Sequence, residues 1–518
     1  MHGHIPYIVT LEKGVDYDQF WAEMETKIHA HPYVPDRPVE INFDQPMLDR
    51  NCIYELTPDE ATLLRNDPRV VNVEDPAYAV AKKALIQPDT NFGKVITVNP
   101  SGNYANWGLI RTNSITNSYG TGEAAPTGYT YTLDGTGVDI IIADSGLEKD
   151  HPEFQNSNGV SRVVDVDMYT YSPALSKPAG WSSNIADLDG HGTHCGGIAA
   201  GKTFGWAKNA NIYCIKAGNG ISNDSANAVS VASGNLTSLI LGFHANKPAN
   251  PVTGQRNPTV VNMSFGFIQT ITGVTGGNYR GGNWTGTALR PDLGMLGAMP
   301  VSANQRLSFI DSYIDQLTDA GIHVCIAAGN SGYKADVIGG PDYNNTWRSL
   351  SVTYFYHQGH SPWAVNAINV GNMSDLVWNA TTDQKTTSSV NGPGVDIYAP
   401  GNRIVSAVSQ TNLYGSYPYY GNSSYKQQAL SGTSMAAPQV AGVAALHLQL
   451  NPKLTPPQLK ATLLADAKPT LYTTGLDNDY TNQRSVCSTV TPKVLYNKYN
   501  AGEDNMASGT SMTFRGLS

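Results

Sequence analysis

Three residues of this chain carry the side chains needed for nucleophilic catalysis, in the order Asp144, His191 and Ser434. Acyl transfer to a serine hydroxyl requires a base that takes the Oγ proton and a carboxylate that orients the imidazole and stabilises its charged form. Each residue alone is common as a turn or helix-cap residue. Their joint occurrence predicts a catalytic triad.

The surrounding sequence suits each of these residues to its role. Asp144 follows the apolar run 138–143, a predicted buried strand, and open α/β sheets bind ligands beyond the carboxyl ends of their strands. His191 is flanked by glycine at the start of a helix of small residues. Ser434 opens an apolar helix, whose positive dipole end would stabilise an oxyanion beside it.

A fourth residue, Asn330, follows the predicted strand 322–328 in a Gly-Asn turn. Such a sequence is often only a turn. The functional interpretation makes the Asn330 side chain an oxyanion donor together with the backbone N–H of Ser434. A second Ser-Gly-Thr-Ser-Met sequence contains Ser511, but no Ala-Ala-Pro and no apolar helix follow it. We therefore do not expect Ser511 to be the nucleophile.

Three segments, 138–154, 189–201 and 430–442, resemble the subtilisin family, and most of all its proteinase K branch. The Gly-His-Gly-Thr-His-Cys sequence around His191 is similar to that branch. The resemblance covers about residues 107–465. It implies a serine endopeptidase that hydrolyses protein or peptide substrates through an acyl-enzyme. It also implies chemistry without a cofactor, and structural calcium whose ligands we do not identify in the sequence.

The resemblance further implies a set of substrate-binding residues. These are Ser264, Phe265 and Gly266, which would pair with substrate as an added β-strand, and Ala327, Ala328 and Gly329, which would line a pocket wall. His194 matches a non-catalytic histidine of the motif and is expected to be structural. Cys195 follows it, and we expect mercurials to inactivate the enzyme by crowding the triad.

The elements that position these residues alternate between apolar strands and helices. The predicted strands are 138–143, 211–216, 259–263, 322–328 and 364–370. Continuous Val/Ile runs are typical of parallel strands buried on both faces, so we predict an α/β fold with a subtilisin-like, doubly wound, mostly parallel sheet. Long Gly/Asn/Tyr-rich insertions at 267–300 and 402–428 are expected to restrict the cleft or to bind an assembly partner.

Residues 1–80 predict a separate ferredoxin-like α+β domain, with strands at 7–11, 52–56 and 70–73 and helices at 17–29 and 58–65. This segment resembles the subtilisin propeptide/inhibitor family. The resemblance implies a domain that chaperones folding and places residues near 75–85 in the protease cleft. We interpret 81–106 as a linker with a processing site, 107–470 as the peptidase domain and 471–518 as an extension without an assigned fold.

Composition limits the partners and the location. The net charge of −9 argues against nucleic acid as the main partner, and no run of 18 apolar residues predicts a membrane span. Five cysteines without regular spacing indicate reduced thiols rather than a disulfide framework. The N-terminus lacks the pattern of a signal peptide. We therefore expect synthesis in the cytoplasm without Sec-type export, and a final location in the cytoplasm or in an assembly such as a virion.

Two other functions are open to a chain of this kind. The missing export signal, the reduced cysteines and the insertions would also suit a structural component of a virion or other assembly, carrying a latent protease-like domain. A lipase or esterase would use the same triad, but the Gly-x-Ser-x-Gly elbow and the Ser-Asp-His order are absent. The complete triad and Asn330 favour the active endopeptidase.

Overall fold

The structure is a computed structural model of the chain. It describes residues 4–12, 14–27, 31–39, 41–43, 51–74, 87–89, 96–99, 102–104, 107–115, 117, 129–182, 184–218, 227–231, 234–271, 273–287, 301–304, 306–349, 352–379, 382–473 and 493–499. The chain divides into two compact units, Met1–Gln87 and Pro88–Ser518.

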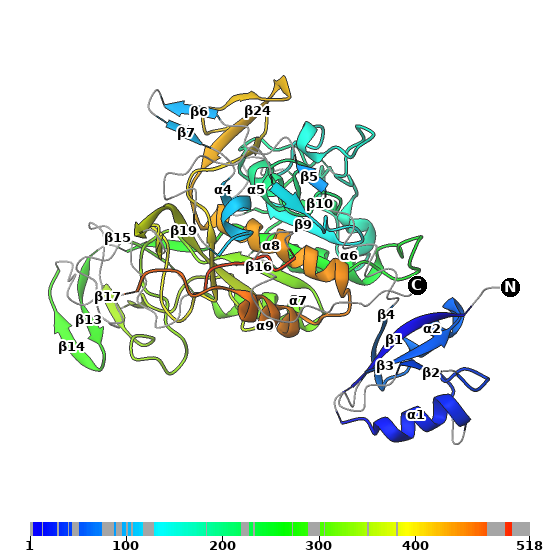
Figure 1. The fold of residues 1–518 in the computed structure, drawn as a ribbon. Coiled ribbons are helices and arrows are strands. Elements are labelled where there is room, and N and C mark those ends of the chain that lie inside the picture. The colour runs from blue at the N-terminus through cyan, green and yellow to red at the C-terminus, as the bar shows by residue number, and fades with distance from the viewer. Residues whose placement is uncertain are drawn as a thin grey trace. The chain divides into compact units, whose positions relative to one another are not determined.

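The first unit, drawn in blue in Figure 1, contains a four-stranded antiparallel sheet with the strand order β2-β3-β1-β4. Its elements are β1 (Ile5–Leu11), α1 (Tyr17–Thr26), β2 (Ile41–Phe43), β3 (Asn51–Leu56), α2 (Pro58–Leu64) and β4 (Val70–Glu74). This β-α-β-β-α-β order is the ferredoxin-like arrangement that the sequence predicts. The short strand β2 has no counterpart in the prediction.

Local sequence explains where the helices of this unit begin and end. Thr57 caps α2 in a capping box, because its side chain accepts from the Glu60 backbone N–H and the Glu60 side chain accepts from the Thr57 N–H. Helix α1 ends at Thr26, three residues before the predicted end, because Lys27 adopts a left-handed backbone with φ 59°.

The second unit is built on a seven-stranded sheet. Its strands are β9 (Asp139–Asp144), β10 (Asn211–Lys216), β11 (Thr259–Met263), β16 (His323–Ala327), β19 (Ile368–Asn379), β20 (Thr382–Lys385) and β21 (Ile397–Pro400). The order is β10-β9-β11-β16-β19-β20, and β21 also pairs with β19. All of these pairs are parallel except β19 with β20.

Helices cover both faces of this sheet, and Figure 1 shows α8 lying over one of them. The helices are α4 (Trp107–Thr112), α5 (His191–Ala200), α6 (Asn235–Asn246), α7 (Ser308–Asp319), α8 (Thr433–Leu450) and α9 (Pro456–Asp466). Ile140 and Ile142 of β9 pack in one core with α5 and α8, whereas Ile141 and Ala143 pack in a second core with α6 and α7. Because successive strand side chains point to opposite faces, β9 must be apolar throughout. The predicted doubly wound α/β fold is confirmed.

The long insertions contain strands. In the insertion 267–300, β12 (Ile268–Ile271) pairs with β15 (Val301–Asn304), which follows it in the chain. The strands β13 (Val274–Tyr279) and β14 (Gly282–Thr285) join β17 (Thr346–Ser349) and β18 (Val352–Phe355), from a later segment, in a sheet of order β14-β13-β17-β18. In the second, the order is β22-β24-β23, from Ile404–Val408, Asn422–Leu430 and Tyr417–Tyr419. The loop-like composition of the two insertions predicts no strands, so the sequence misses these elements.

The remaining elements are short. They are β5 (Gln87–Asp89), β6 (Ile96–Asn99) and β7 (Gly102–Tyr104) within the predicted linker, β8 (Tyr129–Tyr131), and the 3₁₀ turns Pro152–Phe154 and Met168–Tyr171. Near the C-terminus, Val494 and Leu495 are buried in the core of the second unit, and the Leu495 N–H donates to the Tyr398 carbonyl at 2.8 Å. This part of the predicted extension therefore belongs to the packed unit.

None of the helices in the described residues combines the length and the hydropathy that a membrane span requires. Cys195, Cys214 and Cys325 are buried free thiols, as the sequence predicts. The side chain of Cys52 and the whole of Cys487 lie outside the described residues.

Candidate active site

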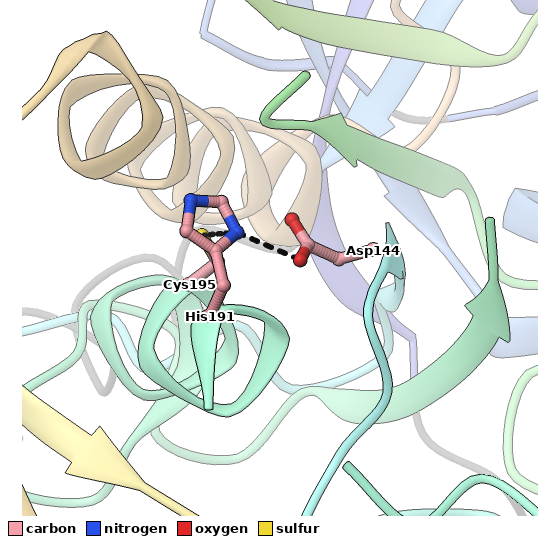
Figure 2. Close-up of side chains that lie close together, drawn as sticks. All are labelled: Asp144, His191 and Cys195. Carbon is pink, nitrogen blue, oxygen red and sulfur yellow. Dashed lines mark hydrogen bonds and ion pairs between the residues drawn. The ribbon is translucent and has the colours of Figure 1, made fainter. Parts of the chain in front are cut away.

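Asp144 and His191 form a hydrogen-bonded pair at the carboxyl end of the sheet (Figure 2). Asp144 is the last residue of β9 and is fully buried. Its Oδ1 accepts from His191 Nδ1 at 2.8 Å and from the Ser145 backbone N–H at 2.7 Å. Because Nδ1 carries the proton that Asp144 accepts, the neutral imidazole presents a lone pair on Nε2. That nitrogen is then able to act as a base.

The first turn of α5, which carries His191, lies directly against the turn that follows β9. A methyl group on Gly192 would lie 2.2 Å from the Gly146 carbonyl oxygen, so only glycine allows this approach. The Asp187 carboxylate accepts from the backbone N–H groups of Gly190 and Thr193, both at 2.9 Å. These bonds satisfy N–H groups that a helix start leaves without partners, and they fix the end of α5 that holds the imidazole.

Ser434 lies in the first turn of α8, after Gly432, whose φ of 155° is tolerated best by glycine. It makes two reciprocal contacts with the residue that follows β11. The Ser434 hydroxyl donates to the Ser264 carbonyl at 3.0 Å, and the Ser264 hydroxyl donates to the Ser434 carbonyl at 2.9 Å. Within the described part of the chain, the Ser434 Oγ thus donates to Ser264 and not to His191. The Ser434 side chain lies where the N-terminus of α8 meets the carboxyl end of β11.

The Asn330 amide is oriented by the residue before Ser434. Its Oδ1 accepts from the backbone N–H of Thr433 at 2.9 Å and from the Thr433 hydroxyl at 3.1 Å. This contact assigns the oxygen, because a backbone N–H requires an acceptor. The Nδ2 group therefore points away from Thr433 and is available as a donor. The same Thr433 Oγ accepts from the Gly329 N–H at 3.1 Å, which ties the end of β16 to α8.

Two opposing effects act on the His191 pKa. Burial is the largest single effect and disfavours the imidazolium, but the charge and hydrogen bond of Asp144 together with the contact of Cys195 outweigh it and raise the pKa of His191 well above its usual value. The Cys195 Sγ lies 3.9 Å from His191 Nδ1 and donates to the Ser434 carbonyl at 3.3 Å. Burial raises the pKa of the Cys195 thiol, so Asp144 is the charge that acts on His191 at neutral pH. This thiol touches both halves of the site.

A pocket of about 300 Å³ opens beside Ser434 and Asn330. Five of the six predicted substrate-binding residues line it: Ser264, Phe265, Gly266, Ala327 and Gly329. Ala328 is not among the described lining residues, and its N–H pairs with the Val370 carbonyl at 2.9 Å. The lining also includes Ser331, His360 and Thr433. Thr433 and Ser331 adjoin predicted residues, but nothing in the sequence singled out His360.

His194 and Ser511 are the two remaining residues from the sequence motifs. His194 is fully buried, with Nε2 3.0 Å from the carbonyls of Ile404 and Gln428. Burial lowers the pKa of His194 to about 3, so the ring is neutral and ties α5 to the β22–β24 sheet. Ser511 lies outside the described residues.

Among the described residues, one group of three side chains could offer ligand atoms to a metal ion: Asp144, His191 and Cys195. Their ligand atoms all lie within 4.8 Å of one another. Its thiol and imidazole do not suit calcium, which takes oxygen ligands. In addition, Asp144 and His191 bind each other. This group of side chains therefore does not fit the structural calcium that the resemblance implies.

The sequence pattern of the subtilase family matches residues 135–512. An extracellular serine proteinase of a Thermus species (strain Rt41A) is 29% identical over 424 residues, 81% of this chain and 71% of that protein. Alkaline serine exoprotease A of Vibrio alginolyticus is 26% identical over 416 residues, 80% of this chain and 54% of that protein. The chain spans about half the length of several relatives that it matches.

Among solved structures, a cold adapted subtilisin-like serine proteinase aligns with a TM-score of 0.46 and 24% identity. The alignment covers 76% of this chain and 97% of that one.

Proposed function

Because the chain belongs to the subtilase family, we propose that it is a serine endopeptidase of the proteinase K branch, with Asp144, His191 and Ser434 as its triad. The observation that carries the proposal is the 2.8 Å hydrogen bond between His191 Nδ1 and buried Asp144. Cys195 contacts both His191 and the Ser434 backbone, so the base and the hydroxyl belong to one site.

The proposed reaction begins when Ser434 Oγ turns from the Ser264 carbonyl to His191 Nε2. His191 takes its proton as Oγ attacks the peptide carbonyl, and Asp144 stabilises the imidazolium. The developing oxyanion accepts from Asn330 Nδ2 and from the Ser434 backbone N–H. His191 then protonates the leaving amine, and a water attacks the acyl-enzyme. No step involves a metal, so any structural calcium would act on stability alone.

We assign protein or peptide chains as substrates, held as an added strand along 264–266. We also assign the first unit as the propeptide, which chaperones folding and inhibits the site; residues 75–85, to which the resemblance gives the inhibitory role, lie outside the described residues. The resemblance in sequence and the ferredoxin-like sheet support this assignment. The insertions are surfaces for an assembly partner.

Replacing Asp144 by Asn tests the catalytic assignment. Loss of the carboxylate leaves the imidazole without the partner that holds its tautomer, so kcat at neutral pH should fall about 10⁴-fold. Because Asp144 raises the pKa of His191, the acidic limb of the kcat/KM profile should also move to lower pH. Peptide hydrolysis followed against pH measures both effects.

The matched control is Asp165→Asn, which removes a carboxylate that pairs with Lys149 at 2.9 Å near the surface. It should change neither kcat nor the pH profile. A wild type that neither cleaves casein nor clips itself between about residues 76 and 106 would contradict the proposal. An intact, inactive wild type in a large assembly would favour the structural role instead.

Mercury compounds should inactivate the enzyme through Cys195. The thiol is fully buried, 3.9 Å from His191 Nδ1, and a bound mercury ion would displace the imidazole from Asp144. We expect loss of most of the activity, restored by excess thiol. The Cys195→Ala variant should keep its activity in mercury although the other four cysteines remain. Equal inactivation of that variant would show that another thiol is responsible.

A further inference from the structure

The start of α5, which carries the proposed base, is held by a side chain outside the helix. His191 is the first residue of α5, and its imidazole projects from that turn toward Asp144 (Figure 2). The N-cap residue Gly190 has no side chain that could accept from the helix N–H groups. The His191 backbone N–H donates instead to Asp189 Oδ1 at 3.2 Å. The Asp189 carboxylate therefore holds the backbone from which the imidazole extends.

The Asp189 carboxylate is in turn held by Tyr414, a residue of the insertion 402–428. The Tyr414 hydroxyl donates to the same oxygen, Asp189 Oδ1, at 2.9 Å. The backbone N–H of Leu413 donates to the Asp189 carbonyl, also at 2.9 Å. A methyl group on Gly190 would lie 2.6 Å from Asn412 Cβ and 3.5 Å from a ring carbon of Tyr414. The loop therefore packs directly on the start of α5.

The loop that carries Tyr414 is fixed by its own hydrogen bonds. Gln428 of β24 donates through Nε2 to the Tyr414 carbonyl at 3.1 Å and also to the Gly415 carbonyl. Asn412 Oδ1 accepts from the Tyr414 N–H at 3.1 Å, and Asn412 Nδ2 donates to the Ser409 carbonyl at 2.8 Å. These bonds give the phenol a defined position beside the start of α5.

The Tyr414 phenol remains a hydrogen-bond donor at neutral pH. Burial has the largest effect on the pKa of Tyr414 and raises it. The His191 charge opposes this effect, and the charge and hydrogen bond of Asp189 add to it. Hydrogen bonds in which the acceptor is a carboxylate are stronger than those between two neutral groups. The bond from Tyr414 is therefore a firm link between the insertion and Asp189.

From these contacts we propose that Tyr414 is a positioning residue for catalysis, which acts through Asp189 to hold the His191 ring within reach of Ser434. The inference rests on the proposed peptidase function. A general base must lie about 2.6–3.2 Å from the atom whose proton it takes, and a misplacement of about 1 Å can cost about 10²-fold in rate. Tyr414 is not among the described residues that line the pocket. Its loss should therefore lower kcat and leave KM unchanged.

A second tyrosine of the same insertion supplies a matched control. Tyr419 also donates its hydroxyl to a carboxylate, Glu153 Oε1, at 2.8 Å. The other oxygen, Glu153 Oε2, accepts from the Thr203 N–H at 2.9 Å, beyond the C-terminal end of α5. A change from Tyr to Phe at either position removes one bond between a phenol and a carboxylate. The bond of Tyr414 lies at the end of α5 that carries His191, and the bond of Tyr419 lies at the other end.

Tyr414→Phe tests the proposal. Its kcat for a peptide substrate should fall about tenfold, with KM unchanged, whereas Tyr419→Phe should keep the wild-type kcat. Asp189→Ala should lose at least as much kcat as Tyr414→Phe. The double variant should be no slower than Asp189→Ala, because Tyr414 acts through that carboxylate and the two losses are not additive. Steady-state hydrolysis, at a temperature where thermal unfolding shows every variant to be folded, measures these values.

Three results would overturn the inference and leave the peptidase assignment standing. Equal losses of kcat in Tyr414→Phe and Tyr419→Phe would show that the insertion stabilises the second unit in general. A rise in KM without a fall in kcat would place Tyr414 on the substrate. Additive losses in the double variant would separate Tyr414 from Asp189. If Tyr414→Phe fails to fold, a wild-type kcat in Asp189→Ala still overturns the inference. A wild type that cleaves no peptide would remove both the inference and the peptidase assignment.

Discussion

Replacing Ser434 by Ala is expected to lower kcat about 10⁶-fold, the loss that follows removal of the nucleophile from a subtilisin. The hydroxyl is the atom that forms the acyl-enzyme, and neither Asp144 nor His191 can replace it. The change removes one oxygen, whose bond in the structure goes to the Ser264 carbonyl. We therefore expect the fold to survive. Hydrolysis of a peptide amide, followed over days for the variant, measures the difference.

The repeated pentapeptide near the C-terminus supplies the control. Ser511→Ala should have wild-type kcat, because no apolar helix follows Ser511 to fix it beside a base. The opposite pattern, an active Ser434→Ala protein and an inactive Ser511→Ala protein, would transfer the nucleophile to the second serine. Equal activity in both variants would exclude a serine mechanism at either site.

The central strands could be predicted because two-sided burial leaves a continuous apolar run in the sequence. β10 and β11 coincide with the predicted ranges 211–216 and 259–263. β19 does not, since it begins at Ile368 and continues to Asn379. Its second half pairs antiparallel with β20, and the polar residues Asn372, Ser374 and Asp375 interrupt any apolar pattern there. Pairing across the sheet, not local composition, sets the length of that strand.

The three residues proposed as the triad could be picked out because each lies in a short segment whose own sequence builds the local geometry. A strand end, a glycine-flanked helix start and a turn before α8 are all local features. His360 had no such signal, because its place depends on the bond from Ser361 to Asp311, 50 positions earlier in the chain. A histidine in a loop has no property that distinguishes a pocket residue from a surface one. The position of His360 in the pocket lining therefore depends on tertiary contacts, while the proposed catalytic residues lie in segments with local signals.

Lowering the pH from 7.5 to 5.5 should cost the protein about 5 kcal/mol of unfolding free energy. Four fully buried histidines contribute most: burial lowers the pKa of His194, His357 and His447 to about 3 and that of His323 to about 4. Burial also lowers the pKa values of His151, His244 and His360, which act in the same direction. Between pH 6.5 and 4 the unfolded chain binds a proton at each, and the native chain does not. Stability therefore falls as the pH falls through this window. At pH 5.5, protonation of each of these four histidines in the unfolded chain lowers the unfolding free energy by about 1.4 kcal/mol. The total unfolding free energy of a protein is typically about 5–15 kcal/mol.

The charges near His447 do not change the direction of its pKa shift. Asp466 Oδ2 lies 3.8 Å from His447 Nε2, but Lys498 pairs with that carboxylate at 2.9 Å, so burial decides the pKa of His447. His191 has a raised pKa, so between pH 7.5 and 6.5 the native chain already binds this proton while the unfolded chain does not. The stabilisation by His191 therefore increases as the pH falls to 6.5, offsets part of the loss from the buried rings, and is fully present below that pH. The histidines whose pKa burial lowers outnumber His191 and therefore set the sign of the slope.

Guanidinium unfolding of the Ser434→Ala protein at pH 7.5, 6.5 and 5.5 measures the slope without self-cleavage. His323→Gln removes one titrating ring and should reduce the loss between pH 7.5 and 5.5 by about 1.4 kcal/mol. Unfolding free energies that are equal at the three pH values would contradict the burial of these rings in neutral form. A steep loss confined to pH below 4 would instead assign acid unfolding to the carboxylates, because their ordinary pKa values lie there.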